Sequence, residues 1–384
     1  MSTAATSSAA VEAAPMTTPA ILTPLDRIPR EPMLPWARQL VDAIKKRFES
    51  VRNTRDRART LGWIGNNAGF IAAHRGDGEV AWRLTERQLW WHGRQARRSG
   101  DAAITAFGVQ PWVNLGRLEA LGGRWREALT RFAGLATYEV ADRLEMGCVR
   151  VGGRAWSVVT PSREEFLGFL EVVYIADSLK AMLLNGRFEL VHPFAERFKG
   201  GGGLRWMCEE ACVVAECRTG DFGAAVARAR AGAGEAKGWH RAVLRLRMAE
   251  AHACAGEIDR AGEILAQMAG VVRQLSPGQK ANPELMPITA RLAGACHEAG
   301  LAAEACAVAR EVLKGARAAN DEMIQIEMLR LLAAAAPDEE RETWIDAART
   351  AEEATEYARF RRGRPPSPNP VFTELYERLE EAYA

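Results

Sequence analysis

The sequence contains no apolar run that approaches the roughly 20 residues needed to cross a bilayer, so no membrane-spanning helix is expected. Its first residues lack the basic and apolar regions of a secretory signal. The seven cysteines are scattered and odd in number, which argues against a disulfide framework and for a reducing compartment. The net charge is only +2, so the chain as a whole is not expected to hold a polyanion. These absences predict a cytoplasmic protein that binds no membrane and for which nucleic acid is an unfavoured partner.

Recognisable catalytic motifs are missing as well. The sequence has no nucleophile elbow, phosphate-binding loop, dinucleotide fingerprint, calcium loop or paired-histidine zinc motif, and its six histidines are scattered. Cys208, Cys212 and Cys217 fall on one predicted helix, but no fourth ligand lies near them at a spacing typical of zinc or iron–sulfur sites. We expect them to be core residues. The sequence therefore predicts no catalytic residue, no metal and no cofactor, and it leaves open whether the protein is an enzyme.

What the chain does contain is a helical pattern, which is clearest in the stretch Trp112–Leu135. Two helical halves are separated by Gly122 and Gly123, and this break predicts a turn in which glycine takes the left-handed conformation. Gly116 and Ala128 are small residues at positions where the two helices would have to approach closely. Large apolar residues occupy the seam between the halves, at Trp112, Leu115, Trp125 and Phe132.

The same arrangement recurs along the chain. The turn glycines are Gly76, Gly123, Gly186, Gly220, Gly256 and Gly300. Five residues after each glycine stands a small or β-branched residue, in the order Ala81, Ala128, Val191, Ala225, Ala261 and Ala305. Seven residues before each glycine stand Gly69, Gly116, Leu179, Val213, Ala249 and Ala293. Two residues after four of the glycines, a large residue is expected to fill the gap beside the turn, at Trp125, Phe188, Phe222 and Ile258.

This frame resembles the tetratricopeptide repeat (TPR), a helix–turn–helix unit of about 34 residues with an aromatic, small residues and a glycine turn at fixed offsets. The turn glycines at 186, 220 and 256 follow one another at 34 and 36 residues, close to that period. Most units lack the proline that often ends a TPR, so the repeats are degenerate. The resemblance implies an all-α fold in which helix pairs wind into a right-handed superhelix over residues 61–362.

TPR proteins bind extended peptides or partner segments on their concave surface, which is lined mainly by the first helix of each pair. Carrying those positions over by the turn glycines implies a groove formed by Trp63, Asn66, Phe70, His74, Arg117, Lys180, Glu210, Arg218, Glu250 and His297. The family's carboxylate clamp of Lys and Asn is not reproduced. Asn66, Arg117 and Lys180 match it only in part, so binding to the C-terminus of a chaperone is not implied.

Arg117 and Lys180 are two of the cations at the predicted groove positions. Neither has an acidic residue four positions earlier, since position 113 is Val and position 176 is Ala. We therefore expect each to be either an ordinary surface charge or a contact for an anionic group of a partner. On this interpretation, truncating either residue to Ala should change the free energy of unfolding by less than about 1 kcal/mol.

The segments that interrupt or flank the array have their own patterns. Residues 1–35 are rich in proline and are predicted to be a disordered tail, and residues 36–60 form a charged helix. Residues 148–159 alternate β-branched and polar residues around Gly152-Gly153, which predicts a small β-hairpin insertion. A basic, proline-rich linker over 363–370 precedes a C-terminal helix over 371–384. That helix has one apolar face that should dock on the array, formed by Phe372, Leu375, Tyr376, Leu379 and Tyr383.

Three functional hypotheses follow from these patterns. The first is a cytoplasmic scaffold or adaptor whose concave groove binds a protein or peptide, because a repeat array offers a long binding surface and needs no chemistry. The second is an enzyme or accessory protein that encloses a small molecule within the array. The third is a ligand-sensing transcriptional regulator, although only residues 36–60 precede the array where such proteins carry a DNA-binding domain. The identity of the partner and the oligomeric state are not predicted by the sequence.

Overall fold

The computed structural model describes residues 33–48, 54–101, 104, 107–137, 149–151, 154–156, 163–198, 202–280, 282, 285–319, 321–353 and 368–384. Apart from two three-residue strands, the regular secondary structure of these residues is helical, so the chain belongs to the all-α class, as predicted. The disordered tail predicted over 1–35 lies outside the described residues as far as residue 32, and so does the 363–367 part of the predicted linker.

After α1 (Met33–Phe48), fourteen of the helices in the described part of the chain form seven consecutive pairs, which we number in chain order. Pairs 1 to 4 are α2 (Thr54–Arg75) with α3 (Gly78–Ser99), α5 (Val109–Leu121) with α6 (Trp125–Ala133), α7 (Arg163–Leu184) with α8 (Phe188–Ala195), and α9 (Gly202–Thr219) with α10 (Phe222–Glu235). Pairs 5 to 7 are α11 (Gly238–Cys254) with α12 (Ile258–Gln274), α14 (Met286–Glu298) with α15 (Ala302–Ala319), and α16 (Glu322–Ala335) with α17 (Asp338–Glu353). Short helical turns, η2 (Gly134–Thr137), η3 (Glu196–Phe198) and α13 (Pro277–Lys280), lie between pairs.

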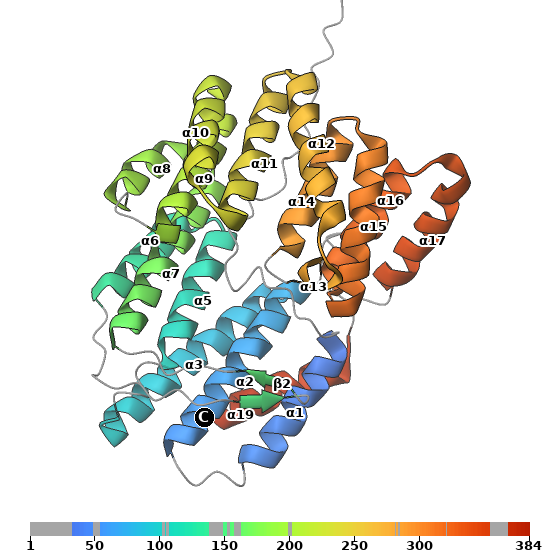
Figure 1. Cartoon of the computed structure of the whole chain (residues 1–384). Coiled ribbons are helices and arrows are strands. Elements are labelled where there is room, and N and C mark those ends of the chain that lie inside the picture. Colours follow the sequence, from blue (N-terminus) through green and yellow to red (C-terminus); the bar gives the residue numbers. More distant parts are fainter. Residues whose placement is uncertain are drawn as a thin grey trace, which may run out of the picture.

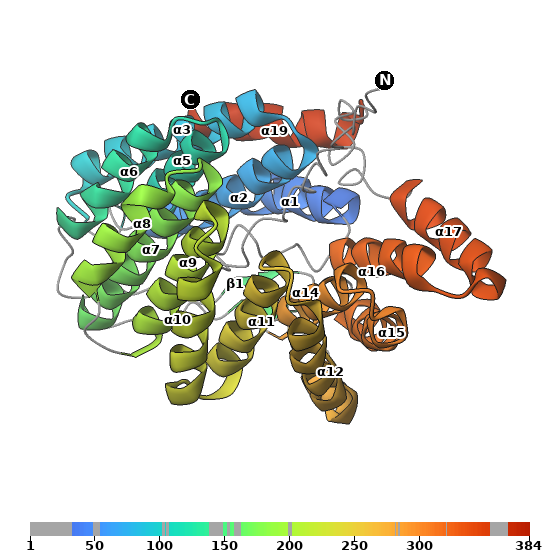
Figure 2. The same cartoon turned by 90° about the horizontal axis from the view of Figure 1, so that it is seen from above.

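The pairs follow one another along an arc (Figures 1 and 2). Figure 2 shows α9, α11, α14 and α16 on the inner side of this arc and α10, α12, α15 and α17 on its outer side. First helices of successive pairs pack against each other, as α5 does on α7, α7 on α9, and α14 on α16. The side of the molecule formed by the first helices is called the inner face below.

Each of the first six pairs turns through a glycine in the left-handed conformation. The φ angles of the six predicted turn glycines lie between 65° and 86°, a region that other residues enter only with strain. In every turn, the residue after the glycine donates its backbone N–H to the carbonyl of the residue five positions earlier, as Asp77 does to Ala72 (2.9 Å) and Asp221 to Glu216 (2.9 Å). This bond satisfies a carbonyl that the end of a helix leaves without a partner.

The two columns of small and apolar residues are buried between the helices of each pair. All six residues five positions after the turn glycine are 0% exposed. Of those seven positions before it, Leu179, Val213, Ala249 and Ala293 are 0% exposed, and the two glycines are buried as well. The large residues expected beside the turn are buried less uniformly. Ile258 is 45% exposed, whereas the aromatic residues at this position are half-buried.

Helices α1 and α19 (Pro370–Tyr383) cover the first pair. The expectation of one helix over 36–60 is wrong, because α1 ends at Phe48 and residues from Thr54 onward belong to α2. Ala37, Leu40 and Ile44 of α1 recur at helical spacing and pack in one cluster with α2 and α19, which a single continuous helix could not do. All five residues of the apolar face of α19 are buried, and the Tyr383 hydroxyl donates a hydrogen bond to the Leu61 carbonyl (2.8 Å).

Two short strands lie between η2 and α7. In the pairing of β1 (Val149–Val151) with β2 (Arg154–Trp156), the strands are antiparallel, with Val149 opposite Trp156 and Val151 opposite Arg154. Both strands fall within the segment 148–159, whose residues 148, 152–153 and 157–159 lie outside the described part of the chain.

The close approach of helices within a pair gives a first prediction. A Cβ atom on Gly116 would lie 2.5 Å from Cε1 of Phe132, so the buried ring of Phe132 or the backbone would have to shift. We expect Gly116→Ala to destabilise the protein by about 1–3 kcal/mol, the usual cost of overpacking. The matched control is Gly294→Ala, since a Cβ there meets no atom within 4 Å. This control should stabilise α14 by up to about 1 kcal/mol. Denaturant unfolding of both variants checks the prediction, and equal shifts would contradict it.

Candidate functional site

A concave feature of the described residues lies on the inner face, where pairs 1, 2 and 3 meet. It is a partly open pocket of about 210 Å³. Its walls come from α2, α3, α5, α6 and α7, and they are formed by Gly69, Phe70, Ala73, His74, Thr85, Asn114, Arg117, Leu118, Ala120, Leu121, Phe132, Asp177, Lys180, Ala181 and Leu184. We call it the inner pocket.

The spacing of these residues from the turn glycines explains why they meet in one pocket. Residues nine, six and two positions before a turn glycine share one face of the first helix, because helical residues three or four apart are neighbours. In pair 2 these positions are Asn114, Arg117 and Leu121, and all three line the inner pocket. Pair 1 contributes Phe70 and His74 at the last two positions, and pair 3 contributes Asp177, Lys180 and Leu184 at all three.

Of the ten groove residues predicted from the sequence, the structure brings four together in this pocket: Phe70, His74, Arg117 and Lys180. Asn66 lies next to it, since the Asn114 side chain donates to its oxygen (3.5 Å). Trp63 packs against the core shared with α1 and α19. The other four lie further along the array, on α9, α11 and α14: Glu210, Arg218, Glu250 and His297.

Arg117 does not have the environment expected for it. Its side chain is 5% exposed and makes a two-pronged ion pair with Asp177, with Nη2 2.8 Å from Oδ2 and Nε 3.1 Å from both carboxylate oxygens. The expectation of a surface cation without an acidic partner is therefore wrong for this residue. The partner was missed because it lies 60 residues away on α7, whereas only positions on the same helix were considered. Lys180 is half-buried at the pocket wall.

Asp177 and Asn114 are two polar residues of the pocket that the sequence did not predict to lie in the groove. Both stand nine positions before their turn glycines, on the same helical face as Arg117 and Lys180. The predicted groove used the position ten residues before the turn glycine, as at Asn66 and Glu210, so these two residues lie one position away from it. Asn114 also accepts a hydrogen bond from Nη1 of Arg117 (3.4 Å), so it helps to hold the guanidinium in place.

On the α2 side of the pocket, Phe70 and His74 stack with ring centroids 3.9 Å apart and planes 26° apart. The Nδ1 atom of His74 lies 3.0 Å from the Phe70 carbonyl oxygen, and this contact fixes the ring because a carbonyl can only accept. Trp36 of α1 packs edge-on against Phe70, with centroids 6.0 Å apart. Phe70 and His74 form the aromatic wall of the pocket, and packing against α1 supports this wall.

Further along the inner face, a chain of charges links pairs 4, 5 and 6. Arg247 of α11 binds Glu210 of α9 (2.7 Å) and Glu250 of its own helix (2.9 Å), and Arg291 of α14 binds Glu250 (2.6 Å). Burial by itself would raise the pKa of Glu250, but the charges of Arg247 and Arg291 outweigh it and hold that pKa below its usual value. Glu210 and Glu250 are thus part of the framework of the inner face.

A second, smaller hollow adjoins this chain of charges. It has a volume of about 70 Å³ and is lined by residues of α11, α12 and α14, among them Cys254, Arg291 and Glu298. Burial and the nearby charge of Glu250 raise the pKa of Glu298. Two predicted groove residues act electrostatically on its lining: Arg218, which is exposed, on Cys254, and His297, which is half-buried, on Glu298. The volume is too small for more than a few atoms, so the inner pocket is the stronger candidate site.

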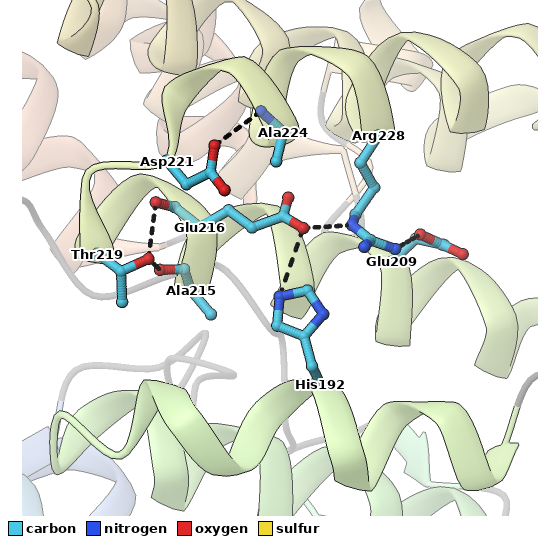
Figure 3. Close-up of polar contacts among 8 residues, drawn as sticks. All are labelled: His192, Glu209, Ala215, Glu216, Thr219, Asp221, Ala224 and Arg228. Atoms are coloured by element: carbon cyan, nitrogen blue, oxygen red, sulfur yellow. Dashed lines mark hydrogen bonds and ion pairs between the residues drawn. The ribbon is translucent and has the colours of Figure 1, made fainter.

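Figure 3 shows a third polar cluster, which joins pairs 3 and 4. His192 of α8 and Arg228 of α10 both point toward the carboxylate of Glu216 on α9, at 3.4 and 2.8 Å, and Arg228 also binds Glu209 (2.9 Å). Pair 2 contains an equivalent bridge, since Glu119 and Arg131 stand at the same offsets from their turn glycine and lie 2.6 Å apart. This repetition indicates a structural tie between the two helices of a pair.

The three cysteines on α9 are core residues, as predicted. Cys208, Cys212 and Cys217 are at most 9% exposed, and burial raises their pKa values to about 11, 12 and 12. Thiols with such pKa values carry almost no thiolate at neutral pH and are poor nucleophiles and metal ligands. Among the residues that the structure describes, no group of His, Cys, Asp and Glu is arranged to hold a metal ion.

Comparison with known proteins adds no family assignment: no protein-family model matches the chain, and no curated protein matches it significantly. Over the described residues, none of the helices combines the length and the hydrophobicity that crossing a membrane would require. Inferences about function therefore rest on the geometry of the inner face.

The ion pair in the inner pocket gives a second prediction. Arg117→Ala leaves Asp177 buried without its counter-charge, so we expect a loss of about 3–5 kcal/mol of stability. The double variant Arg117→Met with Asp177→Leu should recover most of that loss, because neither charge is then buried alone. Lys180→Ala should stay within about 1 kcal/mol of the parent, since Lys180 is only half-buried. Denaturant unfolding curves for all three variants test this prediction. An equally small loss of stability for Arg117→Ala and Lys180→Ala would refute it.

Proposed function

We propose that this chain is a TPR-like helical-repeat protein whose inner face binds a segment of another protein. The observation that carries the proposal is the inner pocket, which equivalent positions on the first helices of three successive pairs line together. A surface built from repeated positions extends along an array and suits an elongated ligand. In this proposal the pairs form a right-handed superhelix, and the segment 148–159 is a β-hairpin inserted between the second and third pairs.

The proposal is supported by the regularity of the turns. Left-handed glycines, the bond that closes each turn and the two buried columns recur in six pairs at the same offsets. Such repetition is typical of arrays in which each pair packs on its neighbours. The inner face also presents both apolar and charged groups, which suits an amphipathic or acidic segment better than a purely hydrophobic one.

A third prediction tests whether the inner face is the binding face. A photo-crosslinking amino acid replaces Leu121, which is 65% exposed at the inner pocket, or Val271, which is 57% exposed on α12. In native cells we expect a discrete crosslinked protein from position 121 and none from position 271, because α12 lies on the outer side of the arc (Figure 2).

The same crosslink provides an internal control through charge. Lys180→Glu at the inner pocket should abolish the product from position 121, whereas Lys314→Glu on α15, whose side chain is 71% exposed, should leave it intact. Equal products from positions 121 and 271, or a product that survives Lys180→Glu, would argue against binding at the inner face.

A further inference from the structure

The C-terminal helix α19 is docked on the first pair through an apolar face and a charged edge. The apolar face is buried in one cluster with residues of α1, α2 and α3. At the edge, Glu374 lies 2.7 Å from Lys45 of α1. Glu380 lies 2.6 Å from Arg83 and 3.3 Å from Arg87, both on α3. The side chains of these ion pairs are between 26% and 48% exposed, so water and salt reach this part of the contact.

Two further contacts of α19 hold α2 near its middle and at its end. The Tyr383 hydroxyl donates a hydrogen bond to the Leu61 carbonyl (2.8 Å). It reaches the backbone because residue 65 is a glycine, since a Cβ atom on Gly65 would lie 2.0 Å from the hydroxyl oxygen. At the last residue of α2, the guanidinium of Arg75 lies 3.6 Å from the centre of the Phe372 ring.

The part of α2 between these two contacts lines the inner pocket. Four of its residues belong to the pocket wall: Gly69, Phe70, Ala73 and His74. The helix also contains glycine at positions 62, 65 and 69. Glycine weakens a helix, and most of the stability of a helix in a protein comes from packing. The order of this part of α2 therefore depends on the elements against which it packs.

A chain of hydrogen bonds continues from the same region to the ion pair in the pocket. The side chain of Gln88 on α3 donates to the Gly62 carbonyl (2.8 Å), which is adjacent to the carbonyl that α19 binds, and to the Asn66 oxygen (3.2 Å). That oxygen also accepts from Asn114 (3.5 Å), whose own oxygen accepts from Arg117 (3.4 Å). A displacement of α2 would therefore also disturb the residues that hold the Arg117 guanidinium.

From these contacts we infer that α19 is a releasable clasp that controls the inner pocket. While α19 is docked, α2 is held on both sides of its pocket-lining part, and Phe70 and His74 form the aromatic wall. Release of α19 frees that part of α2, so the wall is lost and the inner face binds its partner less tightly. The inference rests on the proposed function for the effect on the partner, whereas the effect on α2 needs no ligand.

The test alters the charged edge of α19 in the full-length protein and measures hydrogen–deuterium exchange by mass spectrometry. Glu380→Arg places a cation beside Arg83 and Arg87 and leaves the apolar face unchanged. Two ion pairs are thereby replaced by two repulsions. We expect amide exchange in α19 and in residues 66–75 of α2 to become about five- to thirtyfold faster. Exchange in α11 and α12 should stay as in the parent.

Two controls separate the docking of α19 from a general effect of charge. Glu377→Arg makes the same change at an exposed residue of the same helix and should leave exchange in α2 unchanged. Adding Arg83→Glu and Arg87→Glu to Glu380→Arg reverses the charges on both sides of the contact and should restore slow exchange. Equal exchange in Glu377→Arg and Glu380→Arg would overturn the clasp.

A second variant tests the link to α2 without a change of charge. Tyr383→Phe removes only the hydroxyl that donates to Leu61, and it should make exchange in residues 66–75 about two- to tenfold faster. Thermal melts establish that each variant is folded. Faster exchange in α19 without a change in residues 66–75 would overturn the inference, and so would full protection of α19 in both Glu380→Arg and Tyr383→Phe.

The crosslink from position 121 distinguishes this inference from the proposed function. Glu380→Arg should reduce the product at least about fivefold, and charge reversal at Arg83 and Arg87 should restore it. If the parent gives no product, the proposed function falls, and the exchange measurements still decide whether α19 controls the pocket. If the product persists undiminished in Glu380→Arg although α19 exchanges faster, the proposed function stands and the clasp is overturned.

Discussion

The turn that closes each helix pair is the constraint from which the rest of the structure follows. A glycine at positive φ allows the next residue to bond back to the carbonyl five positions earlier, and this bond sets the rotation of the second helix relative to the first. Once that rotation is set, the positions seven before and five after the glycine face each other and must be small or well packed. The opposite side of the first helix is then left for the inner face.

Charged side chains on that inner face are held in place by one another. The pair Arg117–Asp177 joins α5 to α7, and the chain from Glu210 through Arg247 and Glu250 to Arg291 joins α9, α11 and α14. Removing these groups from water is costly unless each keeps its partner, so the spacing between neighbouring pairs is fixed by electrostatics as well as by packing. A pocket bordered by such ties has a defined shape before any ligand arrives, which lowers the cost of binding.

The C-terminal helix supports the same pocket from a distance. Arg75, at the end of α2, lies 3.6 Å from the centre of the Phe372 ring, and the Tyr383 hydroxyl reaches the backbone at Leu61. Glu380 binds Arg83 and Arg87 of α3. Residues from the end of the chain thus hold the first pair, which supplies the aromatic wall of Phe70 and His74. A substitution that disturbs the packing of α19 on α2 should therefore also affect the pocket, although α19 does not line it.

The sequence by itself determined the features that depend on short-range geometry. Glycine at Gly76 or Gly220, small residues at Ala81 or Ala225, and cysteines at the seam of α9 follow from helical periodicity and from the conformations open to glycine, so they could be predicted from the frame alone. Four of the ten predicted groove residues meet in one pocket for the same reason.

Only the tertiary structure decided which charges lie together. Asp177 neutralises Arg117 across 60 residues because of how pair 3 is rotated on pair 2, and α1 is separate from α2 because both pack on α19. These arrangements depend on the packing between pairs, which the repeat pattern within each pair does not specify.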